Sequence, residues 1–220
     1  MKSVLIFDLD NCLCPASAVG TAFFAPAFDA MRRTGENLLE PAVLQAALDD
    51  CWHHALDWVA ERYNFPEQLR RVAWEAFASL EIEGRLHGYA DLEVVRDLPG
   101  HRFLVTTGFR RLQASKIGAL GIADWFEGVH IDAIDEPGRI GKQGLFVQIL
   151  AAGHWHPEEA LVIGDNPQSE LLAARRLGID SVQTLRPGIV RSDVATHHVT
   201  SLEQLRELLD PPRPLKTEGK

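Results

Sequence analysis

The sequence predicts an α/β protein in which an all-helical domain is inserted into a doubly wound parallel sheet. Short apolar runs that end abruptly at polar or glycine residues are typical of strands buried on both faces. These runs alternate with segments whose apolar residues have helical spacing, as strand–helix–strand crossovers require. Residues 16–86 break the alternation, because they show helical spacing and no convincing strand. This segment therefore predicts the inserted domain.

Continuous hydrophobicity defines the predicted strands. The clearest strands are residues 4–7, 103–105 and 161–163. Weaker candidates are residues 129–131, 181–183 and 197–199. A strand that is apolar at every position is expected to be covered on both faces, which helices on the two sides of a parallel sheet provide.

Helical spacing between these strands predicts the crossover helices. They are expected at residues 109–120, 144–152 and 168–177. A glycine follows each segment where a helix C-cap is expected, at Gly121, Gly153 and Gly178. A glycine in that place adopts the left-handed conformation that ends many helices.

The inserted segment is predicted to contain three helices, at residues 21–33, 41–63 and 66–80. Pro41 and Pro66 suit the first turn of a helix, while the helical pattern is interrupted at Gly35, Asn64 and Gly84. A helical block placed after the first strand is interpreted as a cap over the sheet. The predicted domains are a core of residues 1–15 and 87–210, a cap of residues 16–86, and a loose tail of residues 211–220.

The composition is that of a globular protein and excludes several functions. The 220 residues are 46% hydrophobic and 24% charged, which allows a packed core. A net charge of −9 disfavours binding to a nucleic acid polymer, which needs a dense basic face. No apolar stretch reaches the length of about 18 residues that spans a membrane, so a cytoplasmic location is expected. An odd number of cysteines without disulfide or zinc spacing predicts reduced thiols at Cys12, Cys14 and Cys51.

Polar side chains follow the three clearest strands. Asp8 and Asp10 follow the first strand, Thr106 follows the second and Asp165 lies just after the third. The carboxyl ends of parallel strands meet at one edge of the sheet, where functional groups collect. Acidic groups that meet there would repel one another by about 4 kcal/mol per pair at about 4 Å. A divalent cation would offset this repulsion, and the oxygen ligands point to Mg²⁺.

Four segments together resemble the haloacid dehalogenase (HAD) superfamily, and their order and spacing agree over nearly all of the chain. They are Phe7-Asp8-Leu9-Asp10-Asn11, Leu104-Val105-Thr106-Thr107-Gly108, Lys142 ahead of a helix, and Val162-Ile163-Gly164-Asp165 with Glu170 five residues later. Two positions depart from the pattern of the family. Cys12 stands where a threonine is usual, and Gln143 stands where a proline often follows the lysine. The resemblance implies a HAD-like Rossmannoid core.

The resemblance further implies a Mg²⁺-dependent phosphatase that hydrolyses a small phosphomonoester through an aspartyl-phosphate. Asp8 would be the nucleophile, which divides a very slow hydrolysis into two easier steps. Asp10 would protonate the leaving alkoxide and then take a proton from the hydrolytic water. Asp8 and Asp165 would bind Mg²⁺ through their carboxylates, and Asp10 through its backbone carbonyl. Thr106 and the amide of Thr107 would hold the phosphoryl oxygens, and Lys142 would neutralise charge on Asp8 and on the phosphoryl group.

Several nearby residues are expected to act indirectly or not at all. Glu170 replaces a second aspartate of the motif and is expected to orient a metal-bound water from outside the ligand set. Asn11 and Asn166 are expected to support the site in a similar way, and Asn11 also shapes the loop that leads to the cap. Cys12 is interpreted as a small buried residue. Lys116, a possible rival of the catalytic lysine, is expected on a solvated helix face.

Aromatic and histidine residues of the cap allow two interpretations. A recognition cluster would comprise Trp52, His53, His54, Asp57, Trp58 and Tyr63. However, helical spacing favours packing in the core of the cap for Trp52, Leu56, Val59 and Tyr63. The histidines at 53, 54, 197 and 198 lack a set of partners that could bind a metal. His154 and His156 are expected on the surface.

Three alternative functions are compatible with the same residues. A 2-haloacid dehalogenase expels halide, which needs no proton, so the presence of Asp10 argues against it. A phosphomutase keeps the same core but returns the phosphoryl group to a sugar. A non-catalytic member would only bind a phosphorylated ligand or a protein. The expected partner is a small phosphorylated metabolite such as a nucleotide or a sugar phosphate, and neither its identity nor the oligomeric state follows from the sequence.

Overall fold

The computed structural model describes residues 2–209, which contain a six-stranded sheet. The strands are β1 (Val4–Phe7), β2 (His101–Gly108), β3 (Gly128–Ala133), β4 (Ala160–Gly164), β5 (Asp180–Thr184) and β6 (His197–Val199). Each strand runs parallel to its neighbours, in the order β3-β2-β1-β4-β5-β6. This is a doubly wound order, and its direction reverses between β1 and β4. Ligands of such sheets bind at the carboxyl ends of the strands beside the reversal.

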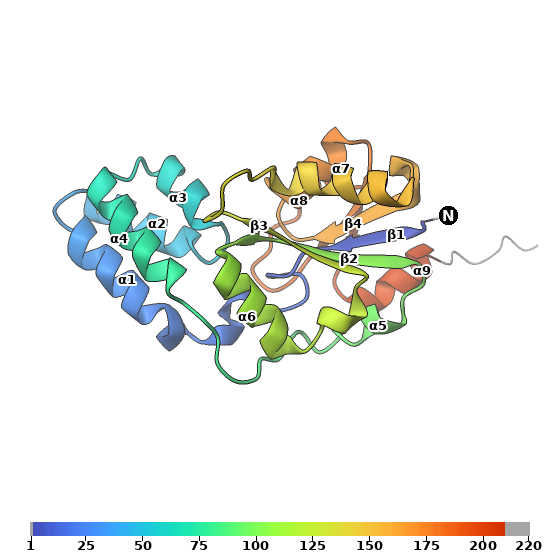
Figure 1. Ribbon diagram of the computed structural model, residues 1–220, viewed down its shortest axis with the longest axis horizontal. Helices are drawn as coiled ribbons and strands as arrows, with labels where there is room; N and C mark the ends of the chain where they lie inside the picture. Colours follow the sequence, from blue (N-terminus) through green and yellow to red (C-terminus); the bar gives the residue numbers. More distant parts are fainter. Residues whose placement is uncertain (1, 210–220) are drawn as a thin grey trace, which may run out of the picture.

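Helices cover both faces of the sheet (Figure 1). One face is covered by α7 (Gly141–Gly153) and α8 (Glu170–Arg176). The other face is covered by α5 (Val94–Asp97), α6 (Arg110–Leu120) and α9 (Leu205–Leu209). Short 3₁₀ helices lie at Ala16–Val19, Ala123–Trp125, Pro157–Glu159 and Leu202–Gln204. The predicted α/β fold class is confirmed.

The residues of β1 alternate between the two faces. Val4 and Ile6 pack in the hydrophobic cluster that contains residues of α7 and α8. Leu5 and Phe7 pack in the opposite cluster, with residues of α6 and α9. Asp8 continues the alternation of Val4 and Ile6, because side chains two apart on an extended chain share a face. It therefore emerges at the end of the strand on the side of α7 and α8.

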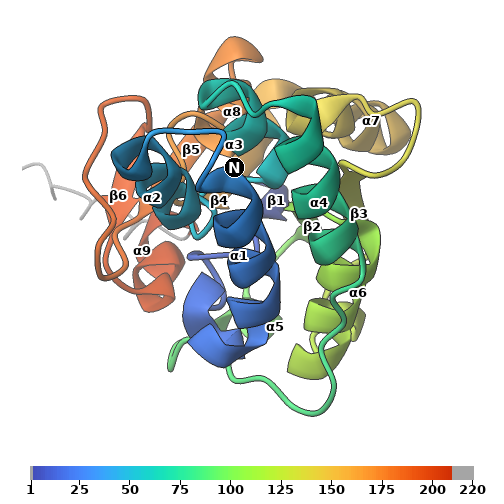
Figure 2. The same cartoon turned by 90° about the vertical axis from the view of Figure 1, so that its left-hand side faces the viewer.

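Residues 16–86 form a group of helices at one end of the sheet, which we call the helical insertion; it lies at the left in Figure 1 and toward the viewer in Figure 2. Its helices are α1 (Thr21–Gly35), α2 (Pro41–Asp50), α3 (Leu56–Arg62) and α4 (Glu67–Ala78). They enclose a hydrophobic cluster of their own, which Phe109 and Leu112 join from the start of α6. The rings of Trp74 and Phe77 lie 5.0 Å and 6.1 Å from the ring of Phe109. The insertion therefore has its own core and rests on α6.

The chain enters and leaves the helical insertion through two adjacent linkers. The backbone N–H of Tyr89, on the returning linker, donates to the carbonyl of Leu13 at 3.0 Å. The buried Arg186, which follows β5, binds both linkers. Its guanidinium donates to the carbonyl of Cys12 at 3.0 Å and to the carboxylate of Asp91 at 2.8 Å. Arg186 thus anchors both linkers next to the end of β5.

The predicted strands all form, and their ends differ from the prediction by no more than three residues. The crossover helices form as well, although α7 begins at Gly141 rather than at residue 144. The predicted helix over residues 41–63 is wrong, because the chain turns between α2 and α3. Ala55 is extended, with φ −65° and ψ 149°, which ends the helical hydrogen bonding. The hydroxyl of Tyr63 donates to Asp50 at 2.7 Å and braces the two helices against each other.

The prediction of Gly153 as a C-cap is also wrong. Gly153 is the last residue of α7, and the left-handed position is taken by His154, with φ 55°. Gly153 meets a different requirement, because a Cβ there would lie 2.1 Å from the ring of Trp155. Gly121 and Gly178 do have positive φ after α6 and α8, at 67° and 70°. His154 and His156 are exposed, as expected.

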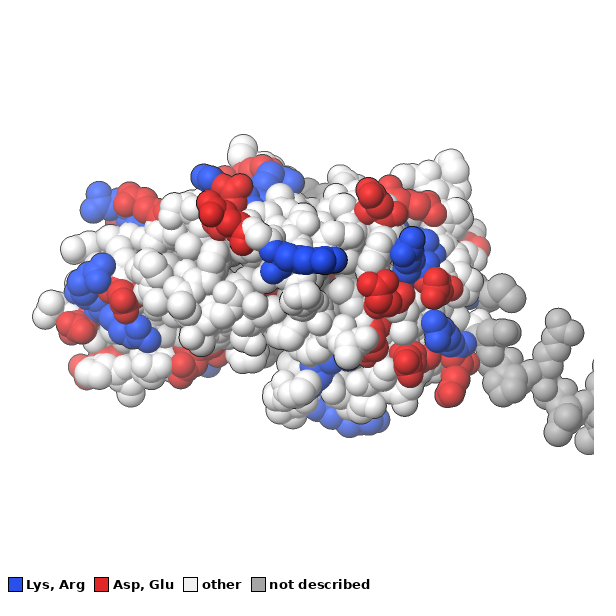
Figure 3. All heavy atoms as spheres, turned by 90° about the horizontal axis from the view of Figure 1, so that it is seen from below, with Lys and Arg blue, Asp and Glu red and all other residues white. Residues whose placement is uncertain are grey.

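The charged side chains of one face and the three cysteines can be compared with the composition. Acidic and basic side chains are interspersed over the face in Figure 3, without a continuous basic stripe on it. Cys12, Cys14 and Cys51 are free thiols, and Cys12 is fully buried. Within residues 2–209, no helix has the length and apolar character to cross a membrane. The predicted tail of residues 211–220 lies outside the described residues.

Candidate active site

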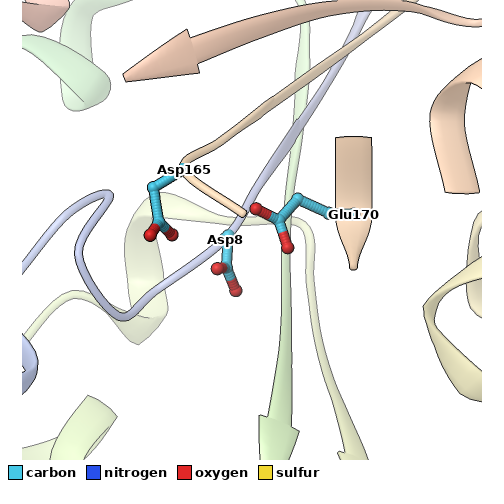
Figure 4. Close-up of side chains that lie close together, drawn as sticks. All are labelled: Asp8, Asp165 and Glu170. Carbon is cyan, nitrogen blue, oxygen red and sulfur yellow. The ribbon is translucent and has the colours of Figure 1, made fainter. Parts of the chain in front are cut away.

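Three carboxyl groups meet at the carboxyl ends of β1 and β4 (Figure 4). Asp8 follows β1, Asp165 follows β4, and Glu170 is the first residue of α8. One oxygen of each lies within 4.8 Å of the other two. Asp8 and Asp165 are 7% exposed and Glu170 is 1% exposed. The structure thus brings Asp8 and Asp165 together, and it places Glu170 among them rather than outside the set.

Lys142, in the first turn of α7, balances part of this charge. Its Nζ donates to Oδ1 of Asp8 at 2.7 Å and to Oε2 of Glu170 at 2.8 Å. Burial alone would lower the pKa of Lys142, but the two carboxylates outweigh burial and raise it. The ammonium therefore stays charged beside Asp8, which is where the sequence places it.

The charge of the carboxyl cluster exceeds what one lysine can neutralise. Burial raises the pKa of Asp8 to about 7 against the opposing effect of Lys142, and the charge of Glu170 adds to the rise. Burial, followed by the charges of Glu170 and Asp8, raises the pKa of Asp165 to about 9. A divalent cation among these oxygens would remove the repulsion, and carboxylate oxygens are the ligands that Mg²⁺ prefers. The donor set of Asp8, Asp165 and Glu170 therefore fits Mg²⁺.

Asp10 is held by two residues of α6. Its Oδ1 accepts a hydrogen bond from Nζ of Lys116 at 2.6 Å, and its Oδ2 accepts one from the amide of Gln113 at 3.3 Å. The expectation that Lys116 lies on a solvated face is wrong, because this residue is only 3% exposed. The apolar stem of a lysine can lie on a buried helix face while its ammonium reaches an inner carboxylate. Helical spacing alone does not reveal that partner.

Thr106 and Thr107 line the site at the end of β2. Thr106 is buried, and its hydroxyl donates to Oε1 of Gln113 at 3.2 Å. Gln113 therefore connects Thr106 to Asp10. The hydroxyl of Thr107 donates to Oδ2 of Asp132 at the end of β3, at 3.1 Å. Both threonines line the cavity.

The two asparagines join the site to the helical insertion. Asn11 has a positive φ of 55°, and its Oδ1 accepts a hydrogen bond from the N–H of Ala16 at 3.0 Å. It therefore shapes the start of the insertion. The backbone N–H of Asn166 donates to Oε1 of Glu170 at 2.6 Å, and its side chain donates to the carbonyl of His53 at 3.3 Å. Both asparagines thus hold loops around the carboxyl cluster.

A cavity of about 410 Å³ lies between this edge of the sheet and the helical insertion, a size that suits a small molecule. Its far wall is aromatic, with Phe24, Trp52, Trp58 and Phe77. Trp52 also packs against the core of the insertion, and Trp58 stacks on His54 with 3.8 Å between ring centroids. Leu56 and Val59 are buried in that core. Core packing is therefore confirmed for Trp52, Leu56 and Val59, while recognition by the cavity-lining residues stays a prediction.

Comparison with known protein families shows which family this chain belongs to. The family model of haloacid dehalogenase-like hydrolases matches residues 2–178, a span that includes all four motif segments. The chain belongs to this family. It is therefore an enzyme of the hydrolase class, as the motifs predict.

Known relatives of this HAD-like hydrolase include proteins named as phosphatases. A glyceraldehyde 3-phosphate phosphatase of Pyrococcus furiosus is 24% identical over 94% of this chain and 92% of the relative. A phosphoserine phosphatase of Thermus thermophilus is 40% identical, but only over 38% of this chain and 34% of the relative.

Solved structures of similar fold include both phosphatases and dehalogenases. A HAD phosphatase of Thermococcus onnurineus superposes with a TM-score of 0.64 at 21% identity, over 95% of this chain and 98% of that one. A 2-haloacid dehalogenase of Pseudomonas syringae superposes with a TM-score of 0.58 at 20% identity, over 95% and 98% of the two chains. Likeness at these identities establishes the fold and leaves the chemistry to the residues of the site.

The site also contains a chain of ion pairs that the sequence analysis did not predict. Arg139, in the loop before α7, forms two hydrogen bonds with Asp132, at 2.8 Å and 2.7 Å. Its remaining nitrogen contacts Asp57 of α3, so the chain crosses from the core to the helical insertion. Asp132 could have been found by the strand-end rule, because it directly follows the predicted strand at residues 129–131. Arg139 carries no comparable signal, and Asp57 is named above only as a member of the possible recognition cluster, without a partner in the core.

Proposed function

We propose that this HAD-like hydrolase is a Mg²⁺-dependent phosphatase that hydrolyses a small phosphomonoester through a phosphoryl group carried on Asp8. The observation that supports the proposal most directly is the buried cluster of Asp8, Asp165 and Glu170, which lines the cavity together with Lys142. The names of the two curated relatives point to the same reaction. Bound Mg²⁺ would supply positive charge that lets an anionic nucleophile meet an anionic phosphate.

The proposed reaction has two steps at phosphorus. A carboxylate oxygen of Asp8 attacks, the bond from phosphorus to the leaving oxygen breaks, and Asp10 gives a proton to the departing alkoxide. A water then attacks the phosphoryl group on Asp8 and transfers a proton to Asp10. This second step releases inorganic phosphate and restores both aspartates. Lys116 and Gln113 bind the carboxylate form of Asp10 in the structure and would orient it to accept the proton of the water.

The phosphoryl oxygens have three proposed partners in the cavity wall. The hydroxyl of Thr106 and the N–H of Thr107 would donate to non-bridging oxygens, and Lys142 would stabilise the negative charge that develops on them. All three residues line the same cavity as Asp8, which supports this assignment. In this arrangement the donors are preorganised, because β2 and α7 fix the positions of their backbones.

The helical insertion is proposed to act as a cap domain, with residues 16–86 closing over a core of residues 1–15 and 87–210. Its own hydrophobic cluster and its two adjacent linkers support this division. Closure would exclude bulk water from the phosphoryl group during transfer. Asp10 favours the phosphatase over a 2-haloacid dehalogenase, because loss of halide requires no proton.

The test is release of inorganic phosphate from an aryl phosphate with and without Mg²⁺. Asp8→Asn and Asp10→Asn should lose nearly all turnover, by a factor of roughly 10³ or more, while circular dichroism and the melting temperature show an intact fold. Asp124→Asn, which changes an exposed aspartate far from the cavity lining, is the matched control and should keep full activity. Undiminished turnover in Asp8→Asn would contradict the proposal. A stoichiometric yield of free phosphate would exclude a phosphomutase.

A further inference from the structure

The walls of the cavity are acidic. Among the residues that the structure describes, seven acidic side chains and four basic side chains line it. Asp8, Asp165 and Glu170 account for the proposed metal site. The remaining acidic groups of the wall are Asp10, Asp57, Glu61 and Asp132. An anionic group on the leaving alcohol of a substrate would therefore need a free cation in the wall.

The buried cations of the wall are already paired. Lys142 is bound between the carboxylates of the metal site, and Lys116 is bound to Asp10. Arg176 lines the cavity from the end of α8, but it is exposed, and within residues 2–209 it has no ion pair. Solvent and salt screen an exposed charge of this kind. Arg139 is also partly exposed, with 32% of its side chain accessible, but carboxylates hold it in place, so its partners determine whether it can bind a second anion.

The carboxylates that contact Arg139 outnumber its single positive charge. It is bidentate to Asp132, which is 4% exposed, and its third nitrogen contacts Asp57 of the helical insertion. Two carboxylates share this one guanidinium, so the group as a whole is anionic. Moreover, Oδ1 of Asp57 is buried without a hydrogen-bond partner among the described residues. An unused acceptor can be satisfied by a hydroxyl group but not by a carboxylate or a phosphate.

From this arrangement we infer that the enzyme prefers phosphomonoesters whose leaving alcohol is uncharged, such as a polyol phosphate, and that Asp57 sets this preference. Asp57 would exclude esters with a second anionic group in two ways. The carboxylate of Asp57 repels the second anionic group directly. It also occupies Arg139, so that the guanidinium is not available to bind that group. The inference rests on the proposed phosphatase activity and names its substrate class.

The experiment compares two esters that share a three-carbon chain. Glycerol 3-phosphate ends in a hydroxymethyl group, and 3-phosphoglycerate carries a carboxylate at the same position. Phosphate release is measured with Mg²⁺ present, and p-nitrophenyl phosphate reports general activity. The wild type should show a kcat/KM for glycerol 3-phosphate that is about tenfold or more above that for 3-phosphoglycerate.

Variants at the ion-pair chain test the role of Asp57. Asp57→Asn should lower that ratio about tenfold, mainly by lowering KM for 3-phosphoglycerate, because Arg139 becomes available to the carboxylate. The double variant Asp57→Asn/Arg139→Gln should lose this gain. Glu75→Gln removes an exposed charge on α4 outside the cavity and should leave the ratio unchanged. The ratio is taken within each variant, so a partly folded preparation does not alter it.

The outcomes separate this inference from the proposed function. Phosphate release from both esters with equal kcat/KM, or with preference for 3-phosphoglycerate, would overturn the inference and leave the phosphatase intact. A preference for 3-phosphoglycerate that Arg176→Gln abolishes would assign the selection to the exposed arginine instead. An unchanged ratio in Asp57→Asn would also overturn it. Absence of phosphate release from every ester, including p-nitrophenyl phosphate, would overturn the proposed function and the inference together.

Discussion

Glu170 and Gly164 form a contact that determines what the acidic motif can do. The sequence identifies both residues and predicts that Glu170 acts from outside the metal-ligand set. In the structure, the Glu170 side chain packs directly over Gly164, where a Cβ would lie 2.4 Å from Oε1. Space at Gly164 thus lets the carboxylate reach Lys142 and approach Asp8. The contact depends on how β4 packs against α8, which one sequence does not reveal.

Gly164→Ala is therefore expected to displace the carboxylate of Glu170. A displacement of about 1 Å in such a site lowers kcat by up to roughly a hundredfold, and the Mg²⁺ concentration for half-maximal rate should rise. Steady-state phosphate release across a Mg²⁺ titration measures both effects. Gly118→Ala is the matched control, because a Cβ on Gly118 would meet nothing within 4 Å. Equal kcat and equal Mg²⁺ dependence in the two variants would show that Glu170 does not depend on Gly164.

Lys116 shows a second limit of sequence reasoning for single residues. A lysine within a helix is usually solvated, so the pattern of α6 indicates an exposed side chain. The carboxylate of Asp10, more than one hundred positions away in the chain, reverses that expectation by binding Nζ at 2.6 Å. Asp8, Asp10 and Asp165 were open to prediction because strand ends converge by topology. A partner on a helix face has no such rule.

At the scale of elements, the strands are predictable because burial on both faces leaves a continuous apolar run. β1 illustrates this, with Val4 and Ile6 on one face and Leu5 and Phe7 on the other. The break between α2 and α3 is not predictable in the same way, because apolar residues keep helical spacing across it. Packing of the insertion and the bond between Tyr63 and Asp50 decide where the chain turns.

Phe109 connects two elements, since it precedes α6 and lies against Trp74 and Phe77 of α4. Phe109→Ala is expected to lower the free energy of unfolding by about 3–5 kcal/mol. It should also detach the helical insertion, so amide hydrogen exchange in residues 16–86 should accelerate more than exchange in β1. Phe146→Ala, in the cluster under α7, removes an equal side chain without contact to the insertion. The same exchange pattern in both variants would argue against a role for Phe109 in docking.

At the scale of the whole molecule, the carboxyl cluster should make stability depend on pH and on metal. Asp8 and Asp165 titrate near 3.8 when unperturbed, and burial raises their pKa in the folded state. The folded state then binds more protons than the unfolded chain above that pH. The free energy of unfolding of the metal-free protein should therefore fall between pH 5 and pH 9, by up to about 1.4 kcal/mol per pH unit for each retained proton.

Urea unfolding in EDTA at pH 5, 7 and 9 measures this dependence, and saturating Mg²⁺ should restore stability most at pH 9. Asp165→Asn removes one of the two titrating groups and should flatten the curve in EDTA. A free energy of unfolding that rises from pH 5 to pH 9 without metal would mean that the two carboxyls are not forced together in the folded protein.

The paired linkers at Leu13 and Tyr89 have a mechanical consequence. Because both passages lie side by side and Arg186 fastens them to the sheet, the proposed closure would move the helices beyond them together, about one hinge at these linkers. Asp8 lies on the fixed side of that hinge, at the end of a strand bonded to β2 and β4. Opening of the helical insertion to release product and admit substrate would thus leave the position of Asp8 unchanged.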